Sequence, residues 1–227
     1  MVLALESSAN ACSVALCEGE NLLAQYFLNS GLTHSKTLLP LIIDVLSKSE
    51  VTLQEIDCLA VAVGPGSFTG LRIGLATIKG LSMSGDIPCI PCSTLASMAW
   101  QLSHLEGYTL VPVMDARRNQ VYTSLFLVEE GVPKRLCPDK AISIAELSEE
   151  LKHIKTKKIL LGDGADLCYG QLEDILIAPP HLRLQMAWGV AQESFRQKEN
   201  ALSGENLLPE YHRLSQAERE RQEKAQA

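Results

Sequence analysis

The stretch that decides the fold runs from residue 58 to residue 74. It reads Cys58-Leu-Ala-Val-Ala-Val63, then Gly64-Pro65-Gly66-Ser67, then Phe68-Thr69-Gly70-Leu71-Arg72-Ile73-Gly74. The first six residues are uninterruptedly apolar, which is typical of a strand that is covered on both faces. The glycine and proline residues indicate a tight turn, and residues 68–84 then repeat apolar side chains at helical spacing, at Leu71, Leu75, Ile78 and Leu81. This order of strand, turn and helix predicts an α/β domain.

The residues around this stretch extend the same pattern. Residues 2–7, 11–17 and 22–28 read as three strands joined by short polar turns, which predicts a β-meander. Apolar residues between 38 and 46 recur at helical spacing, residues 87–91 read as a strand, and residues 93–104 read as a helix. The order βββαβαβ predicts a mixed sheet flanked by helices over residues 1–106.

A second region is predicted over residues 107–227. Residues 109–114, 120–128 and 158–162 read as strands, and residues 143–154 and 187–197 read as helices. The end of the chain, from Ser215 to Ala227, alternates charges with few apolar residues. We therefore expect a second, smaller α/β subdomain followed by a charged C-terminal tail.

Composition limits the classes of function. The chain has 227 residues, 46% of them hydrophobic, and a net charge of −7 with no Lys/Arg cluster. Affinity for phosphates comes mainly from cationic side chains, so we expect weak binding of nucleic acid by this chain alone. The first residues lack the basic and apolar regions of a signal peptide, and no apolar run reaches about 18 residues, so a cytoplasmic protein is expected.

Motifs for catalysis or metal binding are sparse. The five histidines, His34, His104, His153, His181 and His212, lie far apart, and no H-E-x-x-H or G-x-S-x-G string occurs. The seven cysteines include Cys89-Ile90-Pro91-Cys92, which lacks the second pair of a zinc site and is interpreted as structural. We predict no catalytic residue, no metal and no cofactor.

Three turns leave alternatives open. The Gly64–Ser67 turn either cradles an anion with its backbone N–H groups or serves the turn geometry alone. Asp115-Ala116-Arg117-Arg118 suits a phosphate or carboxylate ligand, or is a turn held by an Asp–Arg pair. Gly162-Asp163-Gly164 contacts a nucleotide base or is a simple D-G turn.

The eleven residues from Gly64 to Gly74 resemble the signature of the TsaB (YeaZ) family of glycoprotease-like proteins. Residues 3–8 with 11–16, His34-Ser35 with Leu39-Pro40, and Asp115–Arg118 with Val121-Tyr122 are similar to further segments of that family, as are Pro209-Glu210-Tyr211 and residues 215–219. The resemblance implies the actin-like ATPase (ribonuclease H-like) fold, with two related subdomains. One departure is Glu6, since relatives usually have Asp there, followed by glycine in true ATPases.

The resemblance also implies a role. Members pair with a catalytic paralogue, TsaD, and with the ATPase TsaE, in the bacterial complex that forms N6-threonylcarbamoyladenosine beside the anticodon of tRNA. It implies a non-catalytic assembly subunit that meets tRNA only through the complex and forms a homodimer in isolation. The alternatives are a self-sufficient actin-like ATPase or kinase, a metalloprotease, and a homodimeric scaffold of unrelated purpose.

Glycines in the predicted helix 68–84 suggest where a partner binds. Gly70, Gly74 and Gly80 each weaken a helix by about 0.5–1 kcal/mol relative to alanine, which favours a close approach of another element. That element is either the chain's own sheet or a helix of another subunit, and the resemblance favours the second. The predicted interface comprises Leu38, Leu41, Ile42, Val45, Gly70, Leu71, Gly74, Thr77, Ile78 and Leu81.

Overall fold

The first sheet contains five strands. A computed structural model describes residues 1–212, so the predicted charged tail lies outside the described residues. Strands β1 (Val2–Glu6), β2 (Cys12–Glu18), β3 (Asn21–Leu28), β4 (Cys58–Gly64) and β5 (Cys89–Ser93) are ordered β3-β2-β1-β4-β5. The first three pair antiparallel, and β4 and β5 extend the sheet in parallel, which confirms the predicted mixed sheet.

The two faces of this sheet differ in side-chain size. Helices α1 (His34–Lys48) and α2 (Phe68–Ser82) cover one face, where large residues such as Leu3 and Leu5 point. The opposite face carries small residues, including Ala4, Ala15 and Ala60, and packs against α6 (Ala187–Phe195). Small side chains let the axis of α6 approach the sheet closely. A short 3₁₀ turn, η1 (Leu53–Glu55), leads into β4.

The two cysteines of the C-x-x-C string lie on opposite faces of the sheet. Cys89 belongs to the core under α1 and α2, whereas Cys92 belongs to the core under α6. A spacing of three residues along a strand produces this separation, because successive side chains alternate between faces. All seven cysteines are free thiols, and burial raises the pKa of the Cys92 thiol, as expected of structural residues.

The second sheet repeats the topology of the first. Its main path is β10 (Lys140–Ser143), β7 (Gln120–Thr123), β6 (Thr109–Asp115), β11 (Lys158–Leu161) and β12 (Ile175–Ile177). As in the first sheet, two antiparallel pairs precede two parallel pairs. The predicted strand 120–128 is two strands, because β7 pairs with the end of β6 while β8 (Phe126–Glu129) pairs with its start and with β9 (Val132–Arg135).

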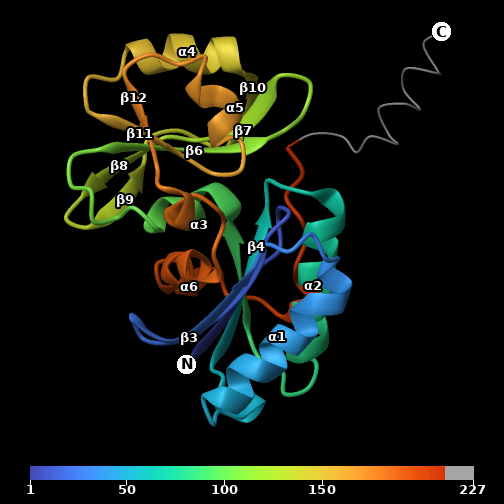
Figure 1. Cartoon of the computed structure of the whole chain (residues 1–227). Coiled ribbons are helices and arrows are strands. Elements are labelled where there is room, and N and C mark those ends of the chain that lie inside the picture. Colours follow the sequence, from blue (N-terminus) through green and yellow to red (C-terminus); the bar gives the residue numbers. More distant parts are fainter. Residues whose placement is uncertain (213–227) are drawn as a thin grey trace, which may run out of the picture.

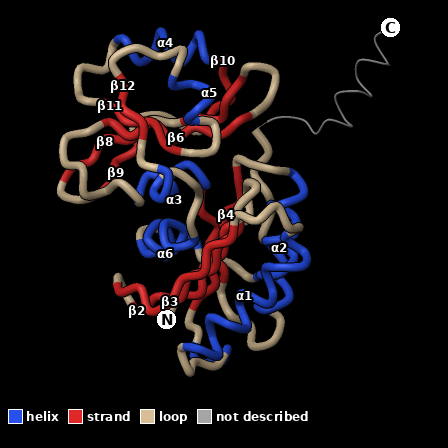
Figure 2. Tube along the Cα trace, in the orientation of Figure 1, coloured by secondary structure: helices blue, strands red, loops and turns tan. Residues whose placement is uncertain are grey.

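Five layers result, as Figures 1 and 2 show. Helices α4 (Ile144–Lys152) and α5 (Ala165–Tyr169) cover the outer face of the second sheet, and α3 (Thr94–Trp100) packs on its inner face. Helix α3 also packs against α6, so these two helices fill the space between the sheets. The chain crosses this space along α3 and again before α6.

The predicted boundary at residue 107 lies between the two sheets. The predicted second subdomain, however, also includes residues from 187 onward, which contact the first sheet. Helix α6 packs on β1, β2 and β4, and Leu202 pairs with Cys89 at the edge of the first sheet. Three 3₁₀ turns connect these segments: η2 (Pro180–Leu182), η3 (Lys198–Asn200) and η4 (Gly204–Asn206). Residues 187–212 therefore belong by their contacts to the first subdomain, because the small-residue face of its sheet needs α6 as cover.

Candidate functional site

A cleft of about 420 Å³ opens between the two subdomains, where four turns meet. These turns follow the carboxyl ends of β1, β4, β6 and β11, the usual place for a ligand site in a sheet of this kind. Its lining comprises Ser8, Ala9, Asn10, Gly66, Ser67, Phe68, Thr69, Met114, Asp115, Ala116, Arg117, Tyr122, Asp163, Glu210, Tyr211 and His212. The sequence-predicted turns at 64–67, 115–118 and 162–164 are thus brought together.

Glu6 lies below this cleft at the end of β1 and is fully buried. One carboxylate oxygen, Oε1, accepts a hydrogen bond of 2.6 Å from the backbone N–H of Ser8. The other, Oε2, has no hydrogen-bond partner among the described residues. Burial raises the pKa of Glu6 to about 7, although the hydrogen bonds from Ser8 and the nearby His34 oppose the shift.

Asp163 supplies a second carboxyl group from the opposite subdomain, and it lines the cleft on the side that is open to solvent. Its Oδ1 accepts a hydrogen bond of 2.8 Å from Nε2 of Gln185. Partial desolvation by the walls of the cleft raises the pKa of Asp163, and its charge contributes to the raised pKa of Glu6. Loss of hydration thus raises the pKa of one carboxyl group from each subdomain near this cleft.

The Gly64–Ser67 turn is occupied by the chain itself. Gly64 has a φ of +139°, and a β-carbon there would overlap the carbonyl oxygen of Glu210. The N–H of Glu210 donates to the carbonyl of Val63 at 2.8 Å, and the N–H of Ser67 donates to the carbonyl of Ser8 at 2.6 Å. The actin-like fold implies a nucleotide in this cleft, but a turn filled by its own backbone and a buried Glu6 carboxyl do not fit a phosphate–metal group.

The segment Pro209–Tyr211, here called the strap, is anchored by an aromatic contact. The Tyr211 ring stacks on the Phe68 ring with centroids 4.2 Å apart, and the Arg72 guanidinium lies 4.0 Å from the Phe68 centroid. Nε of Arg72 donates to the Tyr211 hydroxyl at 3.0 Å. The family resemblance includes Pro209-Glu210-Tyr211, and the structure shows that this segment forms a wall of the cleft at the start of α2.

The turn after β6 is tightly wound. Arg117, Arg118 and Asn119 all have positive φ, and the N–H of Arg117 donates to Oδ1 of Asp115 at 2.6 Å. Three consecutive left-handed residues are uncommon outside functional or strongly constrained turns. The predicted turn is thus present, and it directs Asp115 and Arg117 to the cleft wall.

Most of the predicted interface residues face the chain's own core, which corrects that prediction. Leu38, Ile42, Val45, Leu71 and Ile78 are at most 1% exposed, while Leu41, Thr77 and Leu81 are half-buried. A β-carbon on Gly70 would overlap the carbonyl oxygen of Ser7, and one on Gly74 would overlap the Ser7 hydroxyl. The absence of a side chain at these two glycines therefore leaves room for the turn between β1 and β2 of the same chain.

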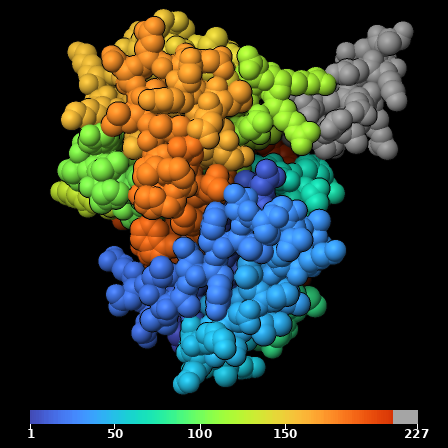
Figure 3. Space-filling view, viewed as in Figure 1, coloured from blue at the N-terminus to red at the C-terminus, as the bar shows by residue number. Residues whose placement is uncertain are grey.

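Gly80 is different, because a β-carbon there would meet nothing within 4 Å. It lies in an exposed stripe along α2 and its C-terminal end, formed by Arg72, Ala76, Gly80 and Met83. The neighbouring helix α1 exposes Leu39 and Ile43, which are 51% and 57% accessible. We call these six residues the helix face, and Figure 3 shows the α1 side of it open at the surface, in blue.

Two further kinds of feature are absent from residues 1–212. Within residues 1–212, no group of three or more His, Cys, Asp or Glu side chains is placed to hold a metal ion. None of the helices in that part of the chain is long and apolar enough to cross a membrane.

Known proteins resemble this chain in sequence and in fold. Residues 29–221 match the family model described as TsaD, tRNA N6-adenosine threonylcarbamoyltransferase. The chain is 31% identical over 225 residues to the tRNA threonylcarbamoyladenosine biosynthesis protein TsaB of Bacillus subtilis, covering 96% of each chain. A Pseudomonas aeruginosa structure described as similar to peptidase YeaZ superposes with a TM-score of 0.82 at 24% identity, over 93% of this chain and 99% of the other.

A more distant structure identifies the fold alone. Component A of (R)-2-hydroxyglutaryl-CoA dehydratase from Acidaminococcus fermentans gives a TM-score of 0.51 at 13% identity, covering 87% of this chain and 98% of that one. Two sheets of matching topology around an inter-subdomain cleft define a protein of the actin-like ATPase fold. Within that fold, the chain belongs to the TsaB family.

Proposed function

We propose that this chain is the non-catalytic partner subunit of the bacterial complex that forms N6-threonylcarbamoyladenosine beside the anticodon of tRNA. Its partners are a TsaD-type catalytic paralogue and a TsaE-type ATPase, and it works in the cytoplasm. One observation carries the proposal: the similarity to a protein named for threonylcarbamoyladenosine biosynthesis extends over 96% of this chain and 96% of that protein.

The cleft supports an assembly role. Its glycine turn holds the strap and its β1 carboxyl group is buried, so the groups that would handle a nucleotide serve the fold of the chain. We therefore propose that the chain acts without a bound nucleotide or metal. A subunit of this kind contributes through its contacts with a partner.

The helix face is the proposed contact surface for the TsaD-type paralogue. The family model that matches residues 29–221 spans both α1 and α2, so a paralogue of the same fold presents the same pair of helices. Two such pairs can join in a four-helix contact, and a second copy of this chain can take the same place when the paralogue is absent. Gly80 and Ala76 leave room for a close helix approach, with Ile43 as an apolar anchor.

Binding of the purified TsaD-type paralogue tests this surface. Gly80→Leu and Ile43→Asp should each weaken binding at least tenfold, because one blocks close approach and the other places a charge in an apolar contact. Gly170→Leu is the matched control, since Gly170 also has open space around it but lies in the second subdomain. Wild-type affinity in both helix-face variants would refute the placement.

A further inference from the structure

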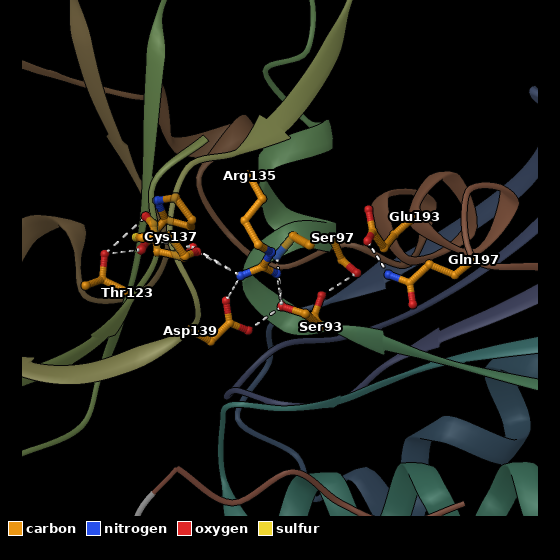
Figure 4. Close-up of polar contacts among 11 residues, drawn as sticks. Ser93, Ser97, Thr123, Arg135, Cys137, Asp139, Glu193 and Gln197 are labelled. Carbon is orange, nitrogen blue, oxygen red and sulfur yellow. Dashed lines mark hydrogen bonds and ion pairs between the residues drawn. The ribbon is translucent and has the colours of Figure 1, made fainter. Parts of the chain in front are cut away.

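A polar network joins the two sheets where the chain first crosses between them. Ser93 ends β5 of the first sheet, whereas Arg135 ends β9 of the second sheet and Asp139 lies just before β10. The Ser93 hydroxyl donates to Oδ2 of Asp139 at 2.5 Å and accepts from Nη2 of Arg135 at 3.1 Å. Figure 4 shows Arg135 and Asp139 converging on Ser93 from the second subdomain.

Each member of the network is satisfied by several partners. The Ser93 hydroxyl also accepts the N–H of Ala96 at 3.1 Å and so caps α3. Nη1 of Arg135 contacts Asp139 as an ion pair and donates to the Ser124 hydroxyl at 3.1 Å. The Asp139 side chain is only 6% exposed, so this charge-assisted contact is weakly screened by water.

Helix α6, which follows the second crossing, is held by close packing against α3. A β-carbon on Gly189 of α6 would overlap the carbonyl oxygen of Ser97 in α3. Nε1 of Trp100 donates to Glu193 at 2.9 Å, and the N–H of Trp188 donates to Oε1 of Gln25 in β3 at 2.9 Å. Helix α6 is thus fixed to α3 on one side and to the first sheet on the other.

We propose that Ser93, Arg135 and Asp139 form a clasp that, with the α3–α6 crossing, locks the two sheets in one relative orientation. Two-domain proteins that close around ligands do so at a few hinge residues between the domains. In this chain the first connection between the two subdomains, where a hinge could lie, is between β5 and α3, and Ser93 of the clasp lies there. The width of the cleft is then fixed, and a partner binds a rigid subunit.

Distance measurement by double electron–electron resonance tests the clasp on the full chain. Cysteines are introduced at two exposed positions, Ser47 of α1 and Glu173 beyond α5, and are labelled with nitroxides. Cys58 and Cys137, the two natural cysteines that are not buried, are replaced by serine. The distance between the labels reports the relative orientation of the subdomains. The parent should give one narrow distance. Arg135→Ala should broaden it or add a second distance, because Ser93 and Asp139 then lose their shared partner.

Lys134→Ala is the matched control, since Lys134 is the neighbouring cation on β9 and forms only an exposed ion pair with Glu129. It should leave the distribution unchanged. Asp139→Asn, which keeps the side-chain volume, should broaden the distribution as Arg135→Ala does, and it decides the matter if Arg135→Ala does not fold. A broad parent distribution, or clasp variants as narrow as the parent, would overturn the proposal.

Discussion

Gly74 of α2 lies against the Ser7 hydroxyl at the end of β1, so closely that a β-carbon at position 74 would overlap the Ser7 Oγ. That hydroxyl is buried and donates to the carbonyl of Gly70 at 3.0 Å. The two helix glycines thus accommodate the turn after β1, and the helix face begins only on the other side of α2.

Gly74→Ala should therefore destabilise the chain by about 1–3 kcal/mol, the usual cost of overpacking a core. Gly80→Ala should stabilise it by about 0.5–1 kcal/mol, because the added methyl group meets open space in a helix interior. Denaturant unfolding of both variants measures this contrast. Equal effects of the two substitutions would contradict the assignment of their surroundings.

The overlap at position 74 is with one atom, so removing that atom should relieve it. Ser7→Ala combined with Gly74→Ala should be more stable than the sum of the two single effects predicts, with a coupling of about 1 kcal/mol. Additive effects in this double-mutant cycle would mean that Gly74 is constrained by something other than the Ser7 hydroxyl.

Glu6 should make stability depend on pH. Its pKa is raised from 4.5 to about 7 in the folded chain, so its contribution to stability is fully present below pH 4.5 and is lost as pH rises through 7. Across this window the free energy of unfolding should fall by up to about 3 kcal/mol from this group. Glu6→Gln should remove most of that slope, and an unchanged slope in urea unfolding between pH 5 and 8 would contradict the buried-carboxyl account.

The strap should depend on the Tyr211 ring more than on its hydroxyl. Tyr211→Ala removes the stack on Phe68 and should lower stability by about 0.5–1.5 kcal/mol, whereas Tyr211→Phe keeps the stack and loses only an exposed hydrogen bond from Arg72. Thermal unfolding of the two variants separates the contributions. A larger loss in Tyr211→Phe than in Tyr211→Ala would contradict the ring-based anchor.

Much of the first sheet could be predicted from sequence, because strands such as residues 58–63 are continuously apolar and their turns contain glycine or proline. In the second sheet the predicted strands include β7, β8 and β11, whereas β9, β10 and β12 are not predicted. Strand β9 reads Val-Pro-Lys-Arg, with a proline and two charges, and β12 is apolar but has only three residues, too few to distinguish a strand from a turn of helix.

The candidate site was predictable only in part. Sequence pattern identified the turns of the cleft, but glycine spacing in α2 could not show which side of the helix each glycine faces. The exposed stripe from Arg72 to Met83 had a signal in its i, i+4 spacing, which was outweighed by the larger apolar stripe of the core. The clasp joins residues more than 40 positions apart, at Ser93 and Arg135, and had no local signal.

Binding of tRNA should be weak for this chain alone, because its net charge is −7 and phosphate affinity depends on cationic groups. Filter binding at physiological salt should retain little tRNA. A sub-micromolar complex that weakens steeply with added salt would show that a basic surface forms in the folded chain and would contradict this expectation.

Transfer of threonylcarbamoyl to tRNA, assayed with purified components singly and together, tests the proposed role most directly. This chain alone should give no modified adenosine, whereas the TsaD-type and TsaE-type proteins should turn over repeatedly only when this chain is added. The Ile43→Asp variant should fail to support turnover, while Gly170→Leu should support it fully. Turnover by this chain alone, or turnover by the other two proteins that is indifferent to its presence, would contradict the account.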